Sequence, residues 1–208
     1  MSLAYRVLYG VGYTPWKEIA DLPEVRAQVA ALLAREEGGR RPPFGPALDL
    51  GCGSGEWAVV LARRGWRVTG VDVVPKALRQ ARAAVRRAGV DVRLVWGDVT
   101  KLAAVGVGGG YTFFLDFGLF HDELTDAQRA AMAREVTAAA APGATLLMMA
   151  WAPKRRRWLP RGASAGEIEA AYRDWHVVGS EPFDVSASPF YRRVTDADPH
   201  FHRLELIR

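Results

Sequence analysis

The stretch ALDLGCGSG, residues 47–55, joins a short apolar run to a turn with three glycines. Such glycines let the backbone approach a ligand, and free amides at the next helix terminus can face it. A dinucleotide fingerprint needs glycine at position six from Gly51, where Glu56 stands, and the Gly-Lys-Ser/Thr of a Walker loop is missing. Asp49 precedes this G-x-G-x-G run, and its carboxylate would repel a pyrophosphate but suit an ammonium group. A tight turn without a ligand is the alternative interpretation.

Strands and helices alternate on the carboxyl side of this turn. Crossover helices of ten to fifteen residues between strands predict a doubly wound α/β fold, with a parallel sheet covered on both faces. The last two strands lack a helix between them, so we expect an antiparallel pair at one edge. Predicted strands cover residues 47–50, 67–71, 90–95, 111–115, 144–150, 175–178 and 201–207, and predicted helices cover 56–65, 76–88, 125 to before Pro142, and 164–172.

The segment 1–45 is predicted to be a helical cap on a single domain whose main part is 46–208. It contains helical spacing over 2–9, an aromatic loop over 13–16, and a helix over 23–37 that Gly38 ends.

Composition excludes several classes of protein. Among 208 residues, half are hydrophobic and a quarter charged, as in a globular protein. One cysteine, Cys52, excludes a disulfide framework, and four scattered histidines give no metal site.

No apolar run approaches a membrane span and no signal peptide is visible, so we expect a cytoplasmic protein that has no membrane partner. The net charge is +5, but the arginines are spread out except at 154–157, so no nucleic-acid partner is expected. The oligomeric state stays open.

Acidic residues end three further predicted strands, where ligands bind in such sheets. Asp72, about 20 residues past the turn, can accept hydrogen bonds from both ribose hydroxyls, or it can only cap the next helix. Asp98 could accept from an adenine amine, and Asp116 ends the fourth strand. An acid at four consecutive strand tips predicts a ligand with an adenosine and a cationic amino-acid tail.

This constellation resembles the class I S-adenosylmethionine-dependent methyltransferases over roughly residues 47–151. The resemblance implies a Rossmann-like sheet of seven strands with the last one antiparallel, and S-adenosylmethionine as cofactor. It also implies these contacts: Gly51, Gly53 and Gly55 with the methionyl part, Asp49 with its ammonium, Asp72 and Val73 with the ribose, Asp98 and Val99 with the adenine, and Asp116 with the reaction centre.

The acceptor side would lie in 116–122, Asp-Phe-Gly-Leu-Phe-His-Asp, which lacks the Asp/Asn-Pro-Pro-aromatic motif of base-amine methylases. We expect Phe117 and Phe120 to line an apolar pocket, with Asp116 and His121 as catalytic candidates. His121 could be a general base, a substrate or cofactor contact, or structural. The favoured function is methylation of an oxygen, nitrogen or sulfur of a small, aromatic molecule. Alternatives are a nucleic-acid or protein methyltransferase, and a cyclase or binding protein that does not methylate.

A second resemblance concerns the segment Tyr13-Thr14-Pro15-Trp16, followed by 22–25, Leu-Pro-Glu-Val. It is similar to the amino-terminal segment of small thiopurine, thiol and halide methyltransferases, which implies that Trp16 covers the cofactor and Tyr13 lies at the substrate pocket. Lys17 stands where that group has an acid, and the matching glycine is missing. Core packing is the alternative role for Trp16.

Overall fold

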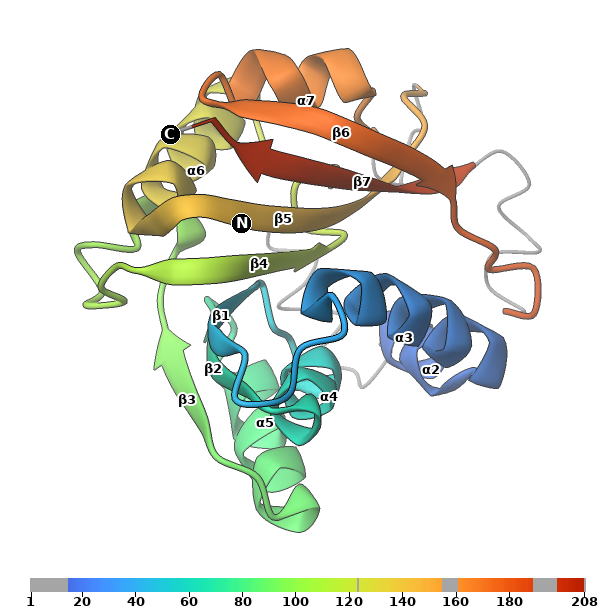
Figure 1. Cartoon of the computed structure of the whole chain (residues 1–208), viewed down its shortest axis with the longest axis vertical. Coiled ribbons are helices and arrows are strands. Elements are labelled where there is room, and N and C mark those ends of the chain that lie inside the picture. The colour runs from blue at the N-terminus through green and yellow to red at the C-terminus, as the bar shows by residue number, and fades with distance from the viewer. Residues whose placement is uncertain (1–14, 123, 155–160, 189–197, 208) are drawn as a thin grey trace.

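The computed structural model describes residues 15–122, 124–154, 161–188 and 198–207, which form one sheet with helices on both faces (Figure 1). The strand order is β3-β2-β1-β4-β5-β7-β6. The strands are β1 (Gly45–Leu50), β2 (Trp66–Asp72), β3 (Val92–Trp96), β4 (Tyr111–Phe117), β5 (Ala140–Trp151), β6 (Trp175–Pro182) and β7 (Pro199–Leu206).

The pairing confirms the predicted doubly wound sheet. Strands β1 to β5 pair in parallel, whereas β7 runs antiparallel to both β5 and β6. The last strand is therefore the antiparallel one, and it lies inside the sheet, with β6 at the edge. The chain order reverses between β1 and β4, so the ligand crevice of this architecture lies beyond the carboxyl ends of those strands.

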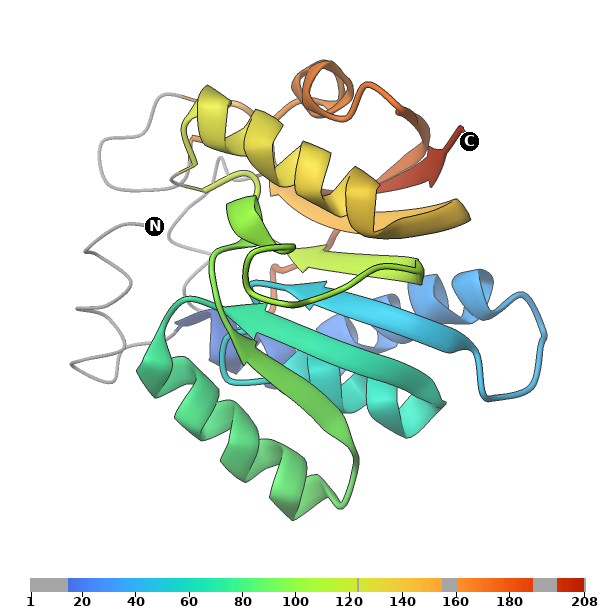
Figure 2. The same ribbon diagram turned by 90° about the vertical axis from the view of Figure 1, so that its left-hand side faces the viewer.

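Helices cover both faces of the sheet and bury two apolar clusters (Figure 2). Leu33 of α3, Leu61 of α4 and Phe113 of β4 belong to one cluster, and Met132 of α6, Ile168 of α7 and Phe114 of β4 to the other. One face carries α2 (Pro15–Asp21), α3 (Pro23–Glu37), α4 (Glu56–Arg64) and α5 (Pro75–Ala88), and the other η1 (Val99–Lys101), α6 (Asp126–Ala139) and α7 (Ala165–Ala171).

Three elements differ most from the sequence-based expectation. Strand β6 continues to Pro182, beyond the predicted end at 178. Strand β5 begins at Ala140 rather than 144, because a register shift opposite Tyr111 and Phe113 accommodates Pro142 and Gly143 inside the strand. Helix α2 begins at Pro15, within the segment that was expected to be an aromatic loop. Proline is favoured at the first position of a helix because its fixed φ suits the helix and its missing N–H is not needed there. The predicted helix over 2–9 lies outside the described residues.

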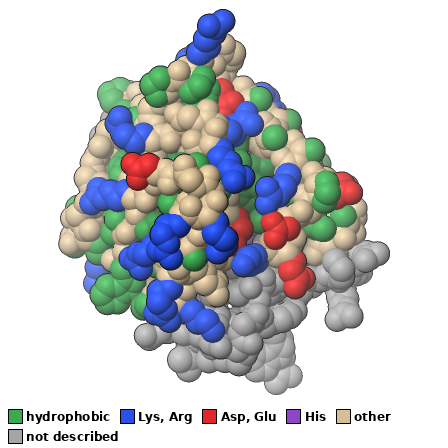
Figure 3. Space-filling model, turned by 90° about the horizontal axis from the view of Figure 1, so that it is seen from below, with side chains coloured by type: hydrophobic (Ala, Val, Ile, Leu, Met, Phe, Trp, Pro, Cys, Tyr) green, Lys and Arg blue, Asp and Glu red, His purple; other side chains and the backbone are tan. Residues whose placement is uncertain are grey.

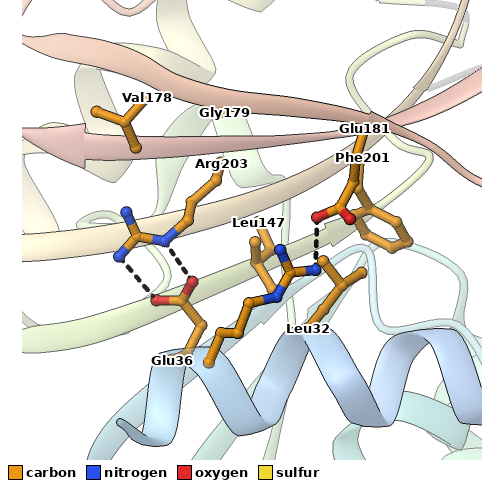
Figure 4. A pocket seen from close by; sticks show the side chains of 9 residues that line it. Leu32, Glu36, Leu147, Val178, Gly179, Glu181, Phe201 and Arg203 are labelled. Carbon is orange, nitrogen blue, oxygen red and sulfur yellow. Dashed lines mark hydrogen bonds and ion pairs between the residues drawn. The ribbon is translucent and has the colours of Figure 1, made fainter.

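Ion pairs fasten α3 to the β6–β7 hairpin (Figure 4). Arg203 Nε lies 2.5 Å from Glu36 Oε1, and Arg35 Nη2 lies 2.6 Å from Glu181 Oε1. Between them is a cavity of about 230 Å³, partly lined by Leu32, and none of the predicted site residues lines it. No helix among the described ranges is long and apolar enough to span a membrane.

Candidate active site

The glycine turn follows β1 directly and leads into α4. Gly51, Gly53 and Gly55 all have positive φ, at 68°, 54° and 85°. A Cβ on Gly51 would lie 3.1 Å from the Leu119 side chain, and one on Gly55 would lie 3.0 Å from Ala81. Both the backbone conformation and the lack of space therefore require glycine at these two positions.

Asp72 fastens this turn to the start of α5. Its Oδ2 accepts a hydrogen bond from the Gly53 amide at 2.9 Å, and its Oδ1 accepts one from the Val74 amide at 2.7 Å. The side chain is buried, and burial raises the pKa of its carboxyl group, while the backbone amides oppose the rise. Asp72 thus closes the turn before α5, whose N-cap residue Val74 has no side-chain cap, and it stands at the strand tip where a ribose contact was predicted.

Asp49 is buried, and the acidic residues Glu56, Asp72 and Asp116 are close enough to act on its charge. Among the residues that the structure describes, its Oδ2 finds no hydrogen-bond partner. Burial raises the pKa of its carboxyl group to about 8, and the charges of Glu56, Asp72 and Asp116 add to the rise. A buried carboxyl group in this setting is suited to receive a positively charged group, which would favour its ionised form.

Asp98 and Val99 follow β3 at the same edge of the sheet. Asp98 Oδ1 accepts from the Thr100 amide at 2.9 Å and from the Thr100 hydroxyl at 2.8 Å, so it caps η1. Val99 is buried, and Val73, after the neighbouring strand, is partly buried.

The carboxylate of Asp116 organises the loop that follows β4. It accepts three backbone hydrogen bonds, from Gly118 at 3.0 Å, Leu119 at 2.6 Å and Phe120 at 3.0 Å. The side chain is fully buried, and burial raises the pKa of its carboxyl group to about 7. The three amide hydrogen bonds and the charge of Arg129 lower this pKa, but their effect is smaller than that of burial. A direct catalytic role for Asp116 stays a prediction, and the role seen in the structure is to hold the 116–122 loop.

His121 is held in one orientation by its surroundings. Its Nδ1 lies 3.2 Å from the Met149 carbonyl oxygen, and its ring stacks on Trp151 with centroids 5.6 Å apart. A carbonyl oxygen can only accept, so Nδ1 carries the proton and Nε2 of the neutral ring is the nitrogen that can take one. The side chain is 3% exposed.

Phe117 and Phe120 lie on opposite faces of the sheet. Phe117 is partly buried and stacks on Trp57 of α4 at 4.5 Å between ring centroids. Phe120 is fully buried in the other cluster, 4.8 Å beneath the Arg129 guanidinium and 5.7 Å from the Tyr172 ring. The structure therefore does not bring these two rings into one pocket. Tyr13 lies outside the described residues, and of Trp16 the structure gives only its place in α2.

The sequence reasoning missed Arg129, a buried residue in the first turn of α6. Its Nη2 donates to the Gly162 carbonyl at 2.9 Å, while the Gly162 amide donates to the His121 carbonyl at 3.1 Å. Its Nε and Nη1 have no hydrogen-bond partner among the described residues. Arg129 thus ties the 116–122 loop to the segment after β5. Nothing in the helical pattern of α6 distinguishes this arginine from exposed ones.

A family model described as a methyltransferase domain matches residues 47–143, the part that contains the glycine turn and all four acidic strand tips. Over these residues the chain is similar to methyltransferase domains, as its resemblance to the class I S-adenosylmethionine-dependent methyltransferases implies. The seven-stranded sheet with its antiparallel last strand agrees with this family. The matched residues start in β1 and stop within β5, so they include Asp116 and His121 but not the β6–β7 hairpin.

Individual relatives are similar over parts of the chain. The 2-heptyl-1-hydroxyquinolin-4(1H)-one methyltransferase of Mycobacteroides abscessus is 31% identical over 106 residues, 50% of this chain and 45% of that protein. Ribosomal RNA small subunit methyltransferase C of Alcanivorax borkumensis is 40% identical over 70 residues, 34% of this chain and 22% of that protein. The matched stretch is thus less than half of either relative.

Solved structures share the fold over nearly the whole chain. The 1,6-didemethyltoxoflavin-N1-methyltransferase of Burkholderia thailandensis superposes with a TM-score of 0.74 at 20% identity, covering 99% of this chain and 86% of that one. That structure holds 1,6-didemethyltoxoflavin and S-adenosylhomocysteine.

Proposed function

We propose that this chain transfers the methyl group of S-adenosylmethionine to an oxygen, nitrogen or sulfur atom of a small, aromatic molecule. The observation that carries the proposal is the buried Asp49 Oδ2 beside the glycine turn, which has no partner among the described residues. The charges of Glu56, Asp72 and Asp116 act on this carboxyl group, and Asp72 and Asp116 stand at the ends of the two neighbouring strands. Such a cluster favours a cationic ligand.

The residues present fit this cofactor. Asp49 would hold the ammonium of the methionyl part, beside the glycine turn that follows β1. Asp72 and Val73 would contact the ribose, and Asp98 and Val99 the adenine. When bound, the cofactor supplies a sulfonium methyl group, whose leaving group needs no acid. The protein's task is then alignment, which is worth up to about 7–11 kcal/mol in an intramolecular reaction.

The acceptor side is the 116–122 loop with His121. The Met149 carbonyl orients the ring of His121, and we assign to its Nε2 the role of proton acceptor for a phenol or similar group. Phe117 adds an aromatic surface beside Trp57. A likeness in fold to a methyltransferase whose structure holds 1,6-didemethyltoxoflavin supports a small acceptor. Residues 1–45, with Tyr13 and Trp16, would cap the site. We place the activity in the cytoplasm, a reducing compartment that suits the single free cysteine.

The test is release of S-adenosylhomocysteine with a panel of phenols, thiols and nitrogen heterocycles. We expect at least one acceptor to give turnover, and Asp72→Asn to raise the cofactor concentration needed for half-maximal rate. Tight cofactor binding without turnover on any small acceptor would contradict the proposal and favour a binding protein or a cyclase.

Nucleic-acid methylation is the second candidate function. One observation favours it: the outer surface of α5 carries a row of arginines that take part in no ion pair among the described residues. RNA added as acceptor in the same assay separates the two candidates.

A further inference from the structure

Helix α5 is basic along its whole outer surface. Its sequence PKALRQARAAVRRA contains five basic residues and no acidic one. Ala77, Leu78 and Ala81 are buried toward the sheet, and the opposite side carries four exposed arginines. These are Arg79, Arg82, Arg86 and Arg87. The spacing of 79, 82 and 86 places three of them in a row along the helix.

Helix stability does not explain this row. Arg86 and Arg87 lie in the last turn, where basic residues are favourable to the helix dipole. Arg79 and Arg82 lie earlier, and like charges at 82 and 86 repel each other. None of the four arginines takes part in an ion pair in the part of the chain that the structure describes. Their charge is thus available to a partner.

Strand β3 adds an aromatic ring to this basic surface. Arg93 of the same strand lies on the opposite face of the sheet, where it donates to the carbonyls of Gly106 at 2.7 Å and Val107 at 3.3 Å. Trp96 is 64% exposed, and its indole N–H donates to the Val73 carbonyl at 3.0 Å. Because Val73 lies just before α5, the ring lies at the start of that helix.

A view of this end of the molecule shows Lys and Arg outnumbering acidic side chains (Figure 3). The nearest exposed acid in sequence is Asp91, in the turn between α5 and β3. We define the α5–β3 face as Arg79, Arg82, Arg86, Arg87 and Trp96.

We propose that the α5–β3 face binds single-stranded nucleic acid. The arginines from Arg79 to Arg87 extend over about 12 Å of helix, along which a phosphate backbone can run. The exposed indole at one end offers a surface on which a base can stack, and such stacking tolerates any sequence. An exposed tryptophan beside arginines fits a strand with free bases better than a duplex, whose bases are already stacked.

The position of Trp96 relates this face to the candidate active site. Trp96 ends β3, and Asp98, the predicted adenine contact, follows two residues later. A strand bound along α5 would therefore have one end at the ligand edge of the sheet. The inference goes beyond the proposed function, since binding does not depend on which molecule is methylated.

The test measures fluorescence anisotropy of a labelled uridine oligonucleotide, about ten nucleotides long, as the salt concentration is varied. Each phosphate contact contributes about −0.7 to the slope of log K against log salt. We expect Arg82→Gln/Arg86→Gln to reduce that slope by about 1.4. Trp96→Ala should weaken binding about 5- to 150-fold and leave the slope unchanged.

The matched control is Arg134→Gln/Arg173→Gln, which removes the same charge from two exposed arginines of α6 and of the turn after α7. The proposal requires the control to bind as the wild type does. Equal losses in both double variants, equal binding of poly-glutamate, or stronger binding of a duplex would each overturn it. The same oligonucleotide as DNA tells whether the 2′-hydroxyl matters.

Failure of this inference is separable from failure of the proposed function. The double arginine variant should bind S-adenosylhomocysteine, measured by calorimetry, as the wild type does, because neither arginine contacts the glycine turn. Absent oligonucleotide binding with normal turnover of a small acceptor refutes the inference alone. Oligonucleotide binding without any methyl transfer refutes the proposed function alone.

Discussion

Asp49 makes the stability of the fold depend on pH. The pKa of its carboxyl group is raised from the ordinary value of 3.8 to about 8 in the folded chain, so the native state holds a proton that the unfolded state loses. The free energy of unfolding should therefore fall as pH rises from about 4 toward 8. Asp116, with a pKa of about 7, adds to the fall in the same direction.

Asp49→Asn should flatten this decline without abolishing it, because Asp116 remains. Urea unfolding of both proteins between about pH 5 and pH 8 measures the two slopes. Identical slopes would show that Asp49 is ionised in the native state across this range.

The orientation of His121 predicts a specific pH–rate behaviour. If Nε2 accepts a proton from an ionisable acceptor, His121→Gln should keep cofactor affinity and lower turnover by about 10²- to 10⁴-fold. The loss should shrink at high pH, where the acceptor ionises without help. The measurement is a pH–rate profile of both enzymes on one phenolic acceptor. Profiles of equal height would exclude the catalytic role, while a parallel loss of stability would indicate packing on Trp151.

At the scale of an element, the start of α6 is fixed by a capping box. The Thr125 hydroxyl accepts from the Gln128 amide at 3.3 Å, and Gln128 Oε1 accepts from the Thr125 amide at 2.9 Å. Thr125→Ala should lower the free energy of unfolding by about 1 kcal/mol, because a helix amide loses its partner. Chemical denaturation measures the change. Thr125→Ser, which keeps the hydroxyl, should stay close to the wild type, and an equal loss there would contradict the capping explanation.

The ends of helices and strands could be predicted from the sequence where an apolar run is followed directly by residues typical of turns or helix caps. The strands ending at Leu50 and Asp72 and the capping box of α6 follow from local pattern alone. Strand β5 was predicted too short, because a proline and a glycine usually end an element but here lie at a register shift against β4. The faces of Phe117 and Phe120 depend on how the 116–122 loop turns around Asp116, which no local periodicity encodes.

At the scale of the whole molecule, ligand binding should raise the melting temperature. S-adenosylhomocysteine at about 100 times its dissociation constant adds about 2.7 kcal/mol of stability, or about 5–10 °C for a chain of this size. Asp72→Ala should reduce that shift, because losing hydrogen bonds to a charged group costs about 1.5–3 kcal/mol of affinity. Differential scanning fluorimetry measures both shifts. An unreduced shift would remove Asp72 from the binding site.

The candidate site was predictable to the level of strand tips and no further. Parallel strands align their carboxyl ends, so Asp49, Asp72, Asp98 and Asp116 had to share one edge of the sheet. The turns decide which carboxylate oxygens have hydrogen-bond partners, because they bring backbone amides to some of these oxygens. At Asp116, for example, three amides of the following loop donate to the carboxylate. Contacts such as Arg129 with Gly162 join segments 33 residues apart and leave no periodic signal.

The place of β7 between β5 and β6 has a consequence for synthesis on the ribosome. Strand β6 emerges first, yet its partner is made later, so residues 175–182 wait unpaired while β5 presents an open edge. At typical translation speeds the delay from Pro182 to Leu206 is about 1 to 5 s. A chain stalled in this interval would have an unpaired edge on β5 and another on β6, and either edge could pair with a second copy of the chain. The sheet is complete only when β7 has paired with both strands.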